Sequence, residues 1–285
     1  MTLRKLPEVK AFRRPSSYQP DAPAEALGQW RPLAAEADGN VVSIYDTIGE
    51  DWFTGEGVTA RRVAGALRGI GQKPVTVNVN SPGGDMFEGL AIYNLLREHP
   101  AEVTVRVMGL AASAASIIAM AGDRIEMGLG SMFMVHNSWG MVVGNQQDMR
   151  DAAETFAEFD AAMADIYAAR TGRDREDVAA LMAAETWLRA ERAIEMGFAE
   201  ATFEAPEYDD KDDGQAGAKA ARARLDATLA KAGMPRVERR ALFREAAGTP
   251  SAAGTATPRA GFELGEADLS GALAQLKAMK EKTNG

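Results

Sequence analysis

VTVNVNSPGGDMFEGLAIYNLLREHPAEVTVRVMGLAASAAS, residues 75–116, contains two β-branched stretches. The first is followed by a segment whose apolar residues have helical spacing, and the second by the start of a short segment rich in small residues. The loop SPGGD (81–85) ends the first stretch, and Pro100 prevents the first helix from continuing. The predicted strands are 75–79 and 103–107, and the predicted helices are 85–98 and 114–121. Strands and helices that alternate at such short intervals are typical of an α/β fold, in which connections are usually parallel and right-handed.

The alternation continues on both sides of this segment. Further strands are predicted at 41–45, around Ile125 and at 132–135, and further helices at 59–70, 145–170, 174–184 and 190–196. The large apolar residues of the longest helix fall mostly on one stripe, made by Met149, Phe156, Phe159, Met163 and Ile166. We therefore expect one α/β domain over residues 41–202.

The two ends of the chain differ from this domain in composition. Residues 1–40 contain five prolines and no lasting apolar period, which predicts a weakly ordered N-terminal arm or propeptide. After Thr202 come an acidic stretch, a stretch rich in Lys and Arg, and a low-complexity stretch. We expect residues 203–285 to form a charged linker and a mostly helical or disordered tail.

Composition narrows the chemistry of the chain. Its 285 residues include 32 basic and 41 acidic side chains, and the net charge of −9 disfavours general binding to nucleic acid or anionic membranes. The absence of cysteine excludes disulfides, zinc–thiolate sites, iron–sulfur clusters and a cysteine nucleophile. With only two histidines, a histidine-rich metal centre is also excluded.

The sequence also indicates where in the cell the protein is expected. The charged N-terminal stretch lacks the apolar region of a secretory signal. The longest apolar stretch, residues 107–122, is shorter than the ~20 residues that span a bilayer, and it is rich in Ala, Ser and Gly. We expect a soluble, cytoplasmic protein with no membrane partner.

Ser113, in GLAASAAS (109–116), lies between a predicted strand and a predicted helix. At the start of a helix a hydroxyl meets unpaired N–H groups and the positive end of the helix dipole, which suits a nucleophile whose reaction builds an oxyanion. Taken alone, the segment fits better a simple N-cap in a tightly packed helix. Ser116 is a competing candidate, but it lies about one turn further into the helix.

The loop SPGGD provides two glycines at a strand end, where backbone can approach a ligand closely. The N–H groups of this glycine pair, together with that of Ala114, would suit an oxyanion, although a Pro-Gly turn is the default interpretation.

His136 follows a predicted strand, and Glu185 lies between two predicted helices, where a carboxylate can orient an imidazole. A lone histidine and a solvated acid are the ordinary interpretations of these two residues. His99, at a helix end before Pro100, is interpreted as structural. Together, however, the serine, the glycine pair, the histidine and the carboxylate provide every part of an acyl-transfer site.

Four motifs together resemble the Clp-type serine peptidases, and within that group the phage head-maturation (prohead) proteases. They are SPGGD before a helix, G-x-x-A-S followed by small residues, M-V-H after a strand, and the closing A-x-x-A-x-x-x-G-F-A-E. The resemblance covers about residues 41–202. His136 follows Ser113 by 23 residues and Glu185 follows His136 by 49, which is similar to the layout of the family.

The resemblance implies a fold and a set of roles. The fold is Clp/crotonase-like, with stacked ββα units and a protruding handle helix. Ser113 would be the nucleophile, His136 the general base and then acid, and Glu185 the third member of the triad, while Gly83 and Ala114 would supply oxyanion-hole N–H groups. No metal or organic cofactor would be needed. Many members carry Asp where this chain has Glu185, so its backbone must lie slightly further back or its orienting role is weaker.

The resemblance also implies partners. The family forms homo-oligomeric rings that enclose the sites, and the handle helix at 145–170 would interlock the rings. For the phage branch, the implied substrates are scaffolding proteins or scaffolding segments of the capsid protein, inside a procapsid assembling in the host cytoplasm. We hypothesise that residues 203–285 target the protease into that shell.

Two other functions stay open at the level of sequence. A crotonase-type acyl-CoA enzyme shares the fold and a G-G-D oxyanion loop, but it gives Ser113 and His136 no joint role. A capsid assembly factor that kept the fold and lost activity is compatible with the basic tail and with glutamate at position 185.

Overall fold

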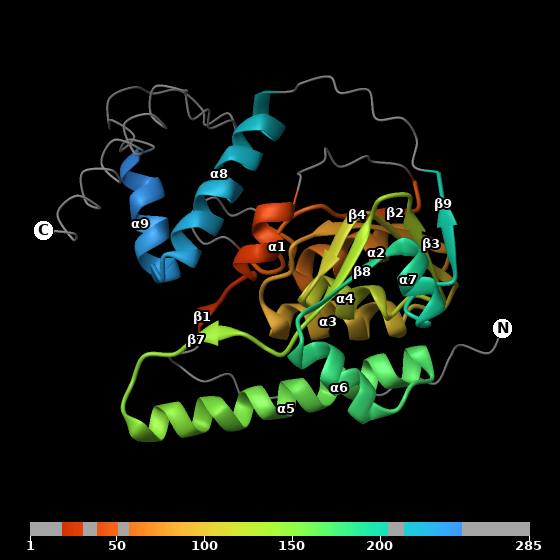
Figure 1. Ribbon diagram of the computed structural model, residues 1–285. Helices are drawn as coiled ribbons and strands as arrows, with labels where there is room; N and C mark the ends of the chain where they lie inside the picture. Colours follow the sequence, from red (N-terminus) through yellow and green to blue (C-terminus); the bar gives the residue numbers. More distant parts are fainter. Residues whose placement is uncertain (1–18, 31–38, 51–56, 205–213, 247–285) are drawn as a thin grey trace, which may run out of the picture. The chain divides into compact units, whose positions relative to one another are not determined.

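β4 (Val103–Ala112) is the strand on which the main sheet is centred (Figure 1). The parallel strands of the sheet are, in order, β2 (Val41–Ile44), β3 (Val75–Ser81), β4, β5 (Arg124–Gly128) and β9 (Ala201–Phe203). The first half of β4 pairs with β5, whereas its end pairs with β6 (Met132–Val135). β8 (Thr186–Arg189) then pairs antiparallel with β6. This computed structural model describes residues 19–30, 39–50, 57–204 and 214–246.

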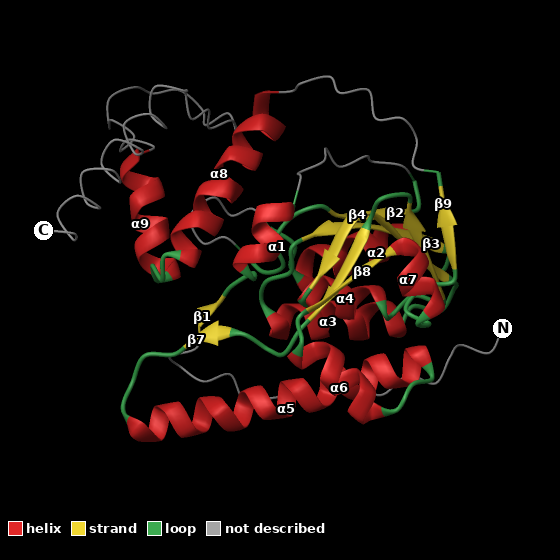
Figure 2. Ribbon diagram, viewed as in Figure 1, coloured by secondary structure: helices red, strands yellow, loops and turns green. Residues whose placement is uncertain are grey.

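Helices connect the successive parallel strands. They are α2 (Ala60–Ile70) between β2 and β3, α3 (Met86–Arg97) between β3 and β4, and α4 (Ala114–Ala119) between β4 and β5. Because such crossovers are right-handed, consecutive helices lie on one face of the sheet (Figure 2). β-branched side chains from the sheet and the apolar side of these helices form the buried core. The predicted α/β fold is therefore confirmed.

Two short strands of the main sheet are not predicted by the sequence patterns. β8 has four residues and β9 has three, which is too short for an alternating pattern to stand out. β8 is preceded by α6 (Arg175–Ala183) and followed by α7 (Ala190–Glu195), both close to their predicted bounds. The chain therefore returns to the sheet between two helices, at the strand that precedes His136.

An irregularity in the β3–β4 pairing shifts the end of β4 along the sheet. β4 contains two more residues than β3 between the aligned pairs Val79–Val107 and Ser81–Ala111. Asn80 Oδ1 accepts a hydrogen bond of 3.1 Å from the N–H of Leu110, so the shifted backbone has a partner. A Cβ at Gly109 would lie 2.8 Å from this oxygen, so glycine is needed beside it. The shift brings the last residues of β4 against β6.

α5 (Gln146–Thr171) is the long helix that the sequence predicts, and it protrudes at one end (Figure 1). Asn145 and Asp148 form a capping box at its start, and Gly172, with a φ of 70°, ends it. Its C-terminal half packs on the core through Phe159, Met163, Ile166 and Tyr167. Met149, although on the predicted apolar stripe, is 44% exposed, because this half of the helix extends beyond the core.

Within the expected weakly ordered arm, residues 1–40, the structure describes residues 19–30 and 39–40, and the others lie outside the described residues. β1 (Gln19–Pro20) pairs antiparallel with β7 (Gly140–Met141), and α1 (Ala24–Gln29) follows. Trp30 is buried, and its Nε1–H donates to the carbonyl of Asn80 at 2.8 Å. This part of the arm is therefore tied to the α/β domain by side-chain and backbone hydrogen bonds.

The chain divides into two compact units, Met1–Lys211 and Asp212–Gly285. In the second unit, α8 (Gly214–Lys231) and α9 (Arg236–Ala246) form a helical hairpin. Arg239 joins the two helices, since its Nε donates to Asp226 at 2.7 Å and its Nη1 to the carbonyl of Met234 at 2.8 Å. The expected tail is helical here, while residues 203–285 also include stretches outside the described residues. None of the helices in the described ranges has the length and apolar character needed to cross a bilayer.

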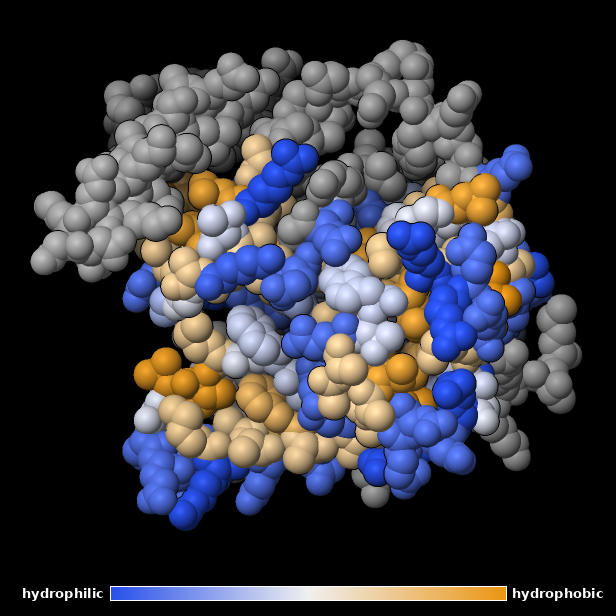
Figure 3. All heavy atoms as spheres, viewed as in Figure 1, coloured by the Kyte–Doolittle hydropathy of each residue, from blue (hydrophilic) through white to orange (hydrophobic). Residues whose placement is uncertain are grey.

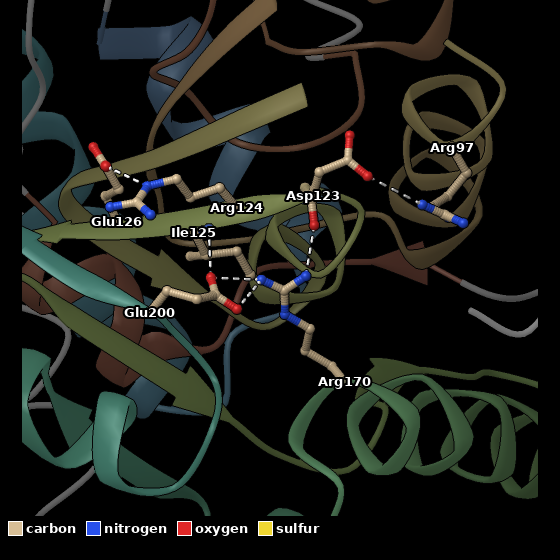
Figure 4. Close-up of polar contacts among 8 residues, drawn as sticks. Arg97, Asp123, Arg124, Ile125, Glu126, Arg170 and Glu200 are labelled. Atoms are coloured by element: carbon tan, nitrogen blue, oxygen red, sulfur yellow. Dashed lines mark hydrogen bonds and ion pairs between the residues drawn. The ribbon is translucent and has the colours of Figure 1, made fainter. Parts of the chain in front are cut away.

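A buried arginine fixes the C-terminal end of α5 to the sheet (Figure 4). The Arg170 side chain is inaccessible to solvent, and its Nη2 lies 2.7 Å from both carboxylate oxygens of Glu200. Its Nη1 donates to the carbonyl of Gly122 at 2.6 Å, and Glu200 also accepts from the N–H of Ile125 at 2.7 Å. The pair therefore links α5, β5 and the segment before β9 through charge-assisted hydrogen bonds.

We predict that Glu200→Gln destabilises the protein by about 2–4 kcal/mol, because it leaves a buried guanidinium without its counter-charge. Urea unfolding of the full-length chain measures this change. Glu195→Gln is the control, since its partner Arg192 and Glu195 itself are 62% and 64% exposed and such pairs contribute about 0–1 kcal/mol. Equal stability of the two variants would contradict the structural role of the buried pair.

Candidate active site

Ser113 occupies a strained position where β4 ends and α4 begins. Its φ and ψ are 54° and −127°, and a positive φ is uncommon for a residue other than glycine. Such a conformation costs on the order of 1–3 kcal/mol and persists only where the surroundings enforce it. The N–H of Ser113 donates to the carbonyl of Met134 at 3.0 Å, which ties the turn to β6.

His136 lies beside this serine. Its Nε2 is 2.7 Å from Ser113 Oγ, and both residues are only 6% exposed. β4 and β6 are hydrogen-bonded neighbours, so the residues that follow them come together at the same edge. Strand pairing thus brings together two residues that lie 23 positions apart in the sequence. The predicted contact between hydroxyl and imidazole is present.

Burial controls the protonation of His136. Removal from water lowers its pKa to about 4, and the negative charge of Glu25 opposes this effect only in part. The imidazole is therefore neutral at pH 7. A neutral ring with its proton on Nδ1 accepts the hydrogen of Ser113 through Nε2, which is the arrangement a general base requires.

The loop SPGGD lies directly against the serine. Gly83 has a φ of 89°, and a Cβ there would lie 2.6 Å from Ser113 Cβ and 2.6 Å from the carbonyl oxygen of Ala112. A side chain at this position would therefore clash with the turn, which explains the glycine. The N–H of Gly83 donates to Ser81 Oγ at 3.2 Å. The N–H of Ala114, at the first position of α4, has no acceptor within its own helix.

Glu185 is near His136 along the backbone, but its side chain is not joined to the ring. Val135 is opposite Thr186 in the antiparallel β6–β8 pair, so Glu185 follows in register opposite His136. Its φ is 47°, and its side chain is exposed. Among the described residues, no hydrogen bond or ion pair connects the two side chains. The structure therefore brings together Ser113, His136, Gly83 and Ala114, whereas it leaves Glu185 turned to solvent.

Glu25 is a residue near the site that the sequence patterns do not reveal. It lies on α1, in the proline-rich arm, yet its charge acts on His136. β1 approaches from the same arm, because it pairs with β7 shortly after His136. Short elements in a proline-rich segment carry no period, so no sequence signal indicates this proximity.

The two other candidates have structural roles. Ser116 is fully buried, and its hydroxyl donates to the carbonyl of Ser113 at 2.6 Å and contacts the hydroxyl of Tyr167 at 2.6 Å. The ring of His99 hydrogen-bonds to the carbonyl of Lys73 at 2.8 Å. Ser116 therefore has no histidine partner, and His99 joins a helix end to the loop before β3.

Residues 66–205 match the family model described as Clp protease. This segment is therefore similar to the Clp protease family. The matched segment contains the serine turn, the glycine loop and the β6–β8 pair. The matched segment includes every strand of the main sheet except β2, which precedes it.

Curated relatives are consistent with this family. The chain is 33% identical over 130 residues to the ATP-dependent Clp protease proteolytic subunit of Leuconostoc citreum, which is 44% of this chain and 65% of that protein. It is 31% identical over 128 residues to the ATP-dependent Clp protease proteolytic subunit 1 of Mycobacterium leprae, 44% of this chain and 64% of that protein. The matches therefore span slightly less than two thirds of these relatives.

The fold is also similar to a solved structure, a ClpP1 variant from Listeria monocytogenes. The TM-score is 0.52 with 22% identity, and the alignment covers 59% of this chain and 92% of that chain. Nearly all of the solved chain is thus matched, whereas a large part of this chain lies outside the match. The comparison establishes a common α/β fold.

We predict that His136 titrates with a pKa of about 4 in the native protein, because burial disfavours the charged ring. NMR of the imidazole protons measures this pKa, and His99→Gln assigns the signal because the chain has two histidines. The unfolded ring binds its proton near pH 6.5. The free energy of unfolding should therefore fall as the pH is lowered from about 6.5 to about 4. A native midpoint at or above 6.5 would contradict the buried, neutral imidazole.

Proposed function

We propose that this protein is a Clp-like serine endopeptidase that cleaves capsid or scaffold proteins during phage head maturation. The observation that carries the peptidase part is the 2.7 Å contact between Ser113 Oγ and His136 Nε2 at a strained helix start. A hydroxyl paired with a neutral imidazole, beside a glycine loop and the first N–H of a helix, is the arrangement of nucleophilic acyl transfer. A crotonase-type reaction would leave this pair without a role.

In the proposed reaction, Ser113 Oγ attacks the carbonyl carbon of a peptide bond while His136 Nε2 accepts the hydroxyl proton. The tetrahedral intermediate collapses when the protonated His136 gives that proton to the leaving amine, which leaves an acyl-enzyme. Water, deprotonated by His136, then attacks the acyl carbon, and Ser113 recovers its proton. The residues of the chain suffice for this sequence of proton transfers.

The oxyanion would be held by the N–H groups of Gly83 and Ala114. Gly83 packs against the Ser113 side chain, and Ala114 is the next residue along the chain, so both N–H groups are close to the reacting atoms. The N–H of Gly83 now donates to Ser81 Oγ over 3.2 Å. A charged oxyanion is a stronger acceptor than this hydroxyl and would replace it.

Glu185 is proposed as the third member of the triad. Its backbone lies opposite His136 by strand register, and its positive φ of 47° marks it as a strained residue. A rotation of its side chain toward the imidazole would raise the pKa of His136 and stabilise the imidazolium that forms during catalysis. Glu185 also follows the C-cap of α6, where a left-handed residue commonly ends a helix, and its N–H donates to the carbonyl of Met182 at 3.1 Å.

A homo-oligomeric ring is the proposed assembly. The exposed apolar residues of the described chain include three near the start of α5, namely Trp139, Val143 and Met149, at 43%, 67% and 44% exposure. Figure 3 shows apolar side chains gathered where β7 leads into α5. A protruding helix beside exposed apolar residues suits burial against a second copy of the chain.

The phage role rests on the prohead-type motifs and on the length of the chain beyond the matched residues. The family match ends at residue 205, and α8 and α9 follow it with several Arg and Lys residues. We propose that residues 203–285 direct the protease into the assembling procapsid in the host cytoplasm, and that residues 1–40 form the arm or propeptide beside the peptidase domain at 41–202.

We predict that a fluorophosphonate probe labels the wild-type chain at Ser113 and that Ser113→Ala abolishes labelling, because the activated hydroxyl is the group that reacts. Peptide mapping by mass spectrometry identifies the modified residue. Ser138→Ala is the matched control, since the Ser138 hydroxyl donates to the carbonyl of Phe156 and has no histidine partner. Labelling that persists in Ser113→Ala would exclude Ser113 as the nucleophile.

Co-expression with the capsid protein then tests the substrate. Wild type should trim the capsid or scaffold chain, and Ser113→Ala should reduce trimming by at least about 1000-fold. A protein that reacts with the probe but leaves the capsid and scaffold chains intact would contradict the capsid role and still support peptidase activity. A protein that takes up no probe but still promotes capsid assembly would support an inactive assembly factor instead.

Glu185→Gln should reduce the labelling rate by about tenfold or more if the carboxylate orients His136 and stabilises its protonated form during the reaction. The amide keeps the size of the side chain and removes its charge. Glu176→Gln, at an exposed acid near the start of α6, is the control and should react like the wild type. A wild-type rate in Glu185→Gln would remove Glu185 from the triad.

A further inference from the structure

A buried chain of hydroxyl groups connects α5 to the backbone of the nucleophile. Tyr167 OH lies 2.6 Å from Ser116 Oγ, and Ser116 Oγ lies 2.6 Å from the carbonyl oxygen of Ser113. Tyr167 and Ser116 are both inaccessible to solvent. The three groups therefore form a continuous path from the long helix through α4 to the serine turn.

The direction of each hydrogen bond follows from the number of protons. A backbone carbonyl only accepts, so the single hydrogen of the Ser116 hydroxyl is used toward Ser113. The Ser116 oxygen must then accept from Tyr167, whose phenol keeps its proton because burial raises its pKa. The order is Tyr167 O–H to Ser116 Oγ, and Ser116 O–H to the Ser113 carbonyl. Hydrogen bonds arranged head to tail in this way strengthen one another in a buried environment.

The Ser113 carbonyl belongs to the same peptide unit as the N–H of Ala114. This unit is planar and trans, so its C=O and N–H point in opposite directions. Fixing the oxygen therefore fixes the direction of the N–H at the other end of the unit. The carbonyl also accepts from the N–H of Ser116 at 2.9 Å and of Ile117 at 3.3 Å, which makes it one of the most heavily bonded groups of the site.

We propose that Tyr167 and Ser116 are positioning residues for the reaction: they hold the Ser113–Ala114 peptide so that the Ala114 N–H is aimed at the developing oxyanion. This inference rests on the proposed function. Neither side chain touches the reacting atoms, and both act through the Ser113 carbonyl. The hydroxyl chain also polarises that peptide, which makes its N–H a better donor. A phenylalanine at position 167 would fill the same space without these effects.

The test is the rate at which a fluorophosphonate inactivates the full-length protein, separated into the limiting rate and the half-saturating concentration. Tyr167→Phe should lower the limiting rate about tenfold and leave half-saturation unchanged, because loss of a whole oxyanion donor costs about 100-fold to 1000-fold and this donor is only misdirected. Ser116→Ala should lower it at least as much. The double variant should be no slower than Ser116→Ala, since both changes break one chain.

The matched control is Tyr93→Phe, which removes the hydroxyl of another fully buried tyrosine, on α3. Its limiting rate should equal that of the wild type, and the NMR pKa of His136 should be the same in all variants. A wild-type rate in Tyr167→Phe, or an equal loss in Tyr93→Phe, would overturn the positioning role while the peptidase stands. If Ser116→Ala does not fold, the limiting rate of Tyr167→Phe alone tests the positioning role. A wild-type chain that the probe does not label would refute the proposed function and this inference with it.

Discussion

The left-handed turn at Ser113 is the constraint around which the site is built. A non-glycine residue adopts a positive φ only when several neighbours make every alternative worse. Here the Ser113 N–H is held by β6, its carbonyl by three donors from α4, and its side chain by contact with Gly83. These contacts come from three separate parts of the chain. The strain is thus distributed over the fold, and the hydroxyl is held where a short strand and a glycine loop converge.

The organisation of β4 explains how one strand can serve both the core and the site. Its first half is an ordinary parallel member of the sheet, with Val105 and Val107 inaccessible to solvent. After the two-residue shift beside Asn80, its second half pairs with β6 instead of β5. The same asparagine accepts the Leu110 N–H through its side chain and the Trp30 indole through its backbone. One polar residue therefore stabilises the irregular strand and anchors the N-terminal segment.

The two halves of α5 have different surroundings. The C-terminal half is fixed to the sheet by the buried Arg170–Glu200 pair and supplies Tyr167 to the serine turn. The N-terminal half extends beyond the core and exposes Met149. A rigid attachment at one end allows the other end to protrude without loss of helical structure. The protruding half therefore continues directly into the part of the helix that contacts the serine turn.

Sequence patterns alone predicted the α/β order, the long helix, the glycine loop and the pairing of Ser113 with His136. Local patterns suffice for the first three features, because the period of apolar residues and the special backbone of glycine act over a few residues. Tertiary structure decided the antiparallel return of β8, the attachment of residues 19–30, the influence of Glu25 on His136 and the exposure of the Glu185 side chain. It also decided that Ser116 supports the turn through Tyr167, 51 residues away. Such contacts depend on which surfaces pack together and which way a side chain turns at the end of a strand, and no local period encodes either.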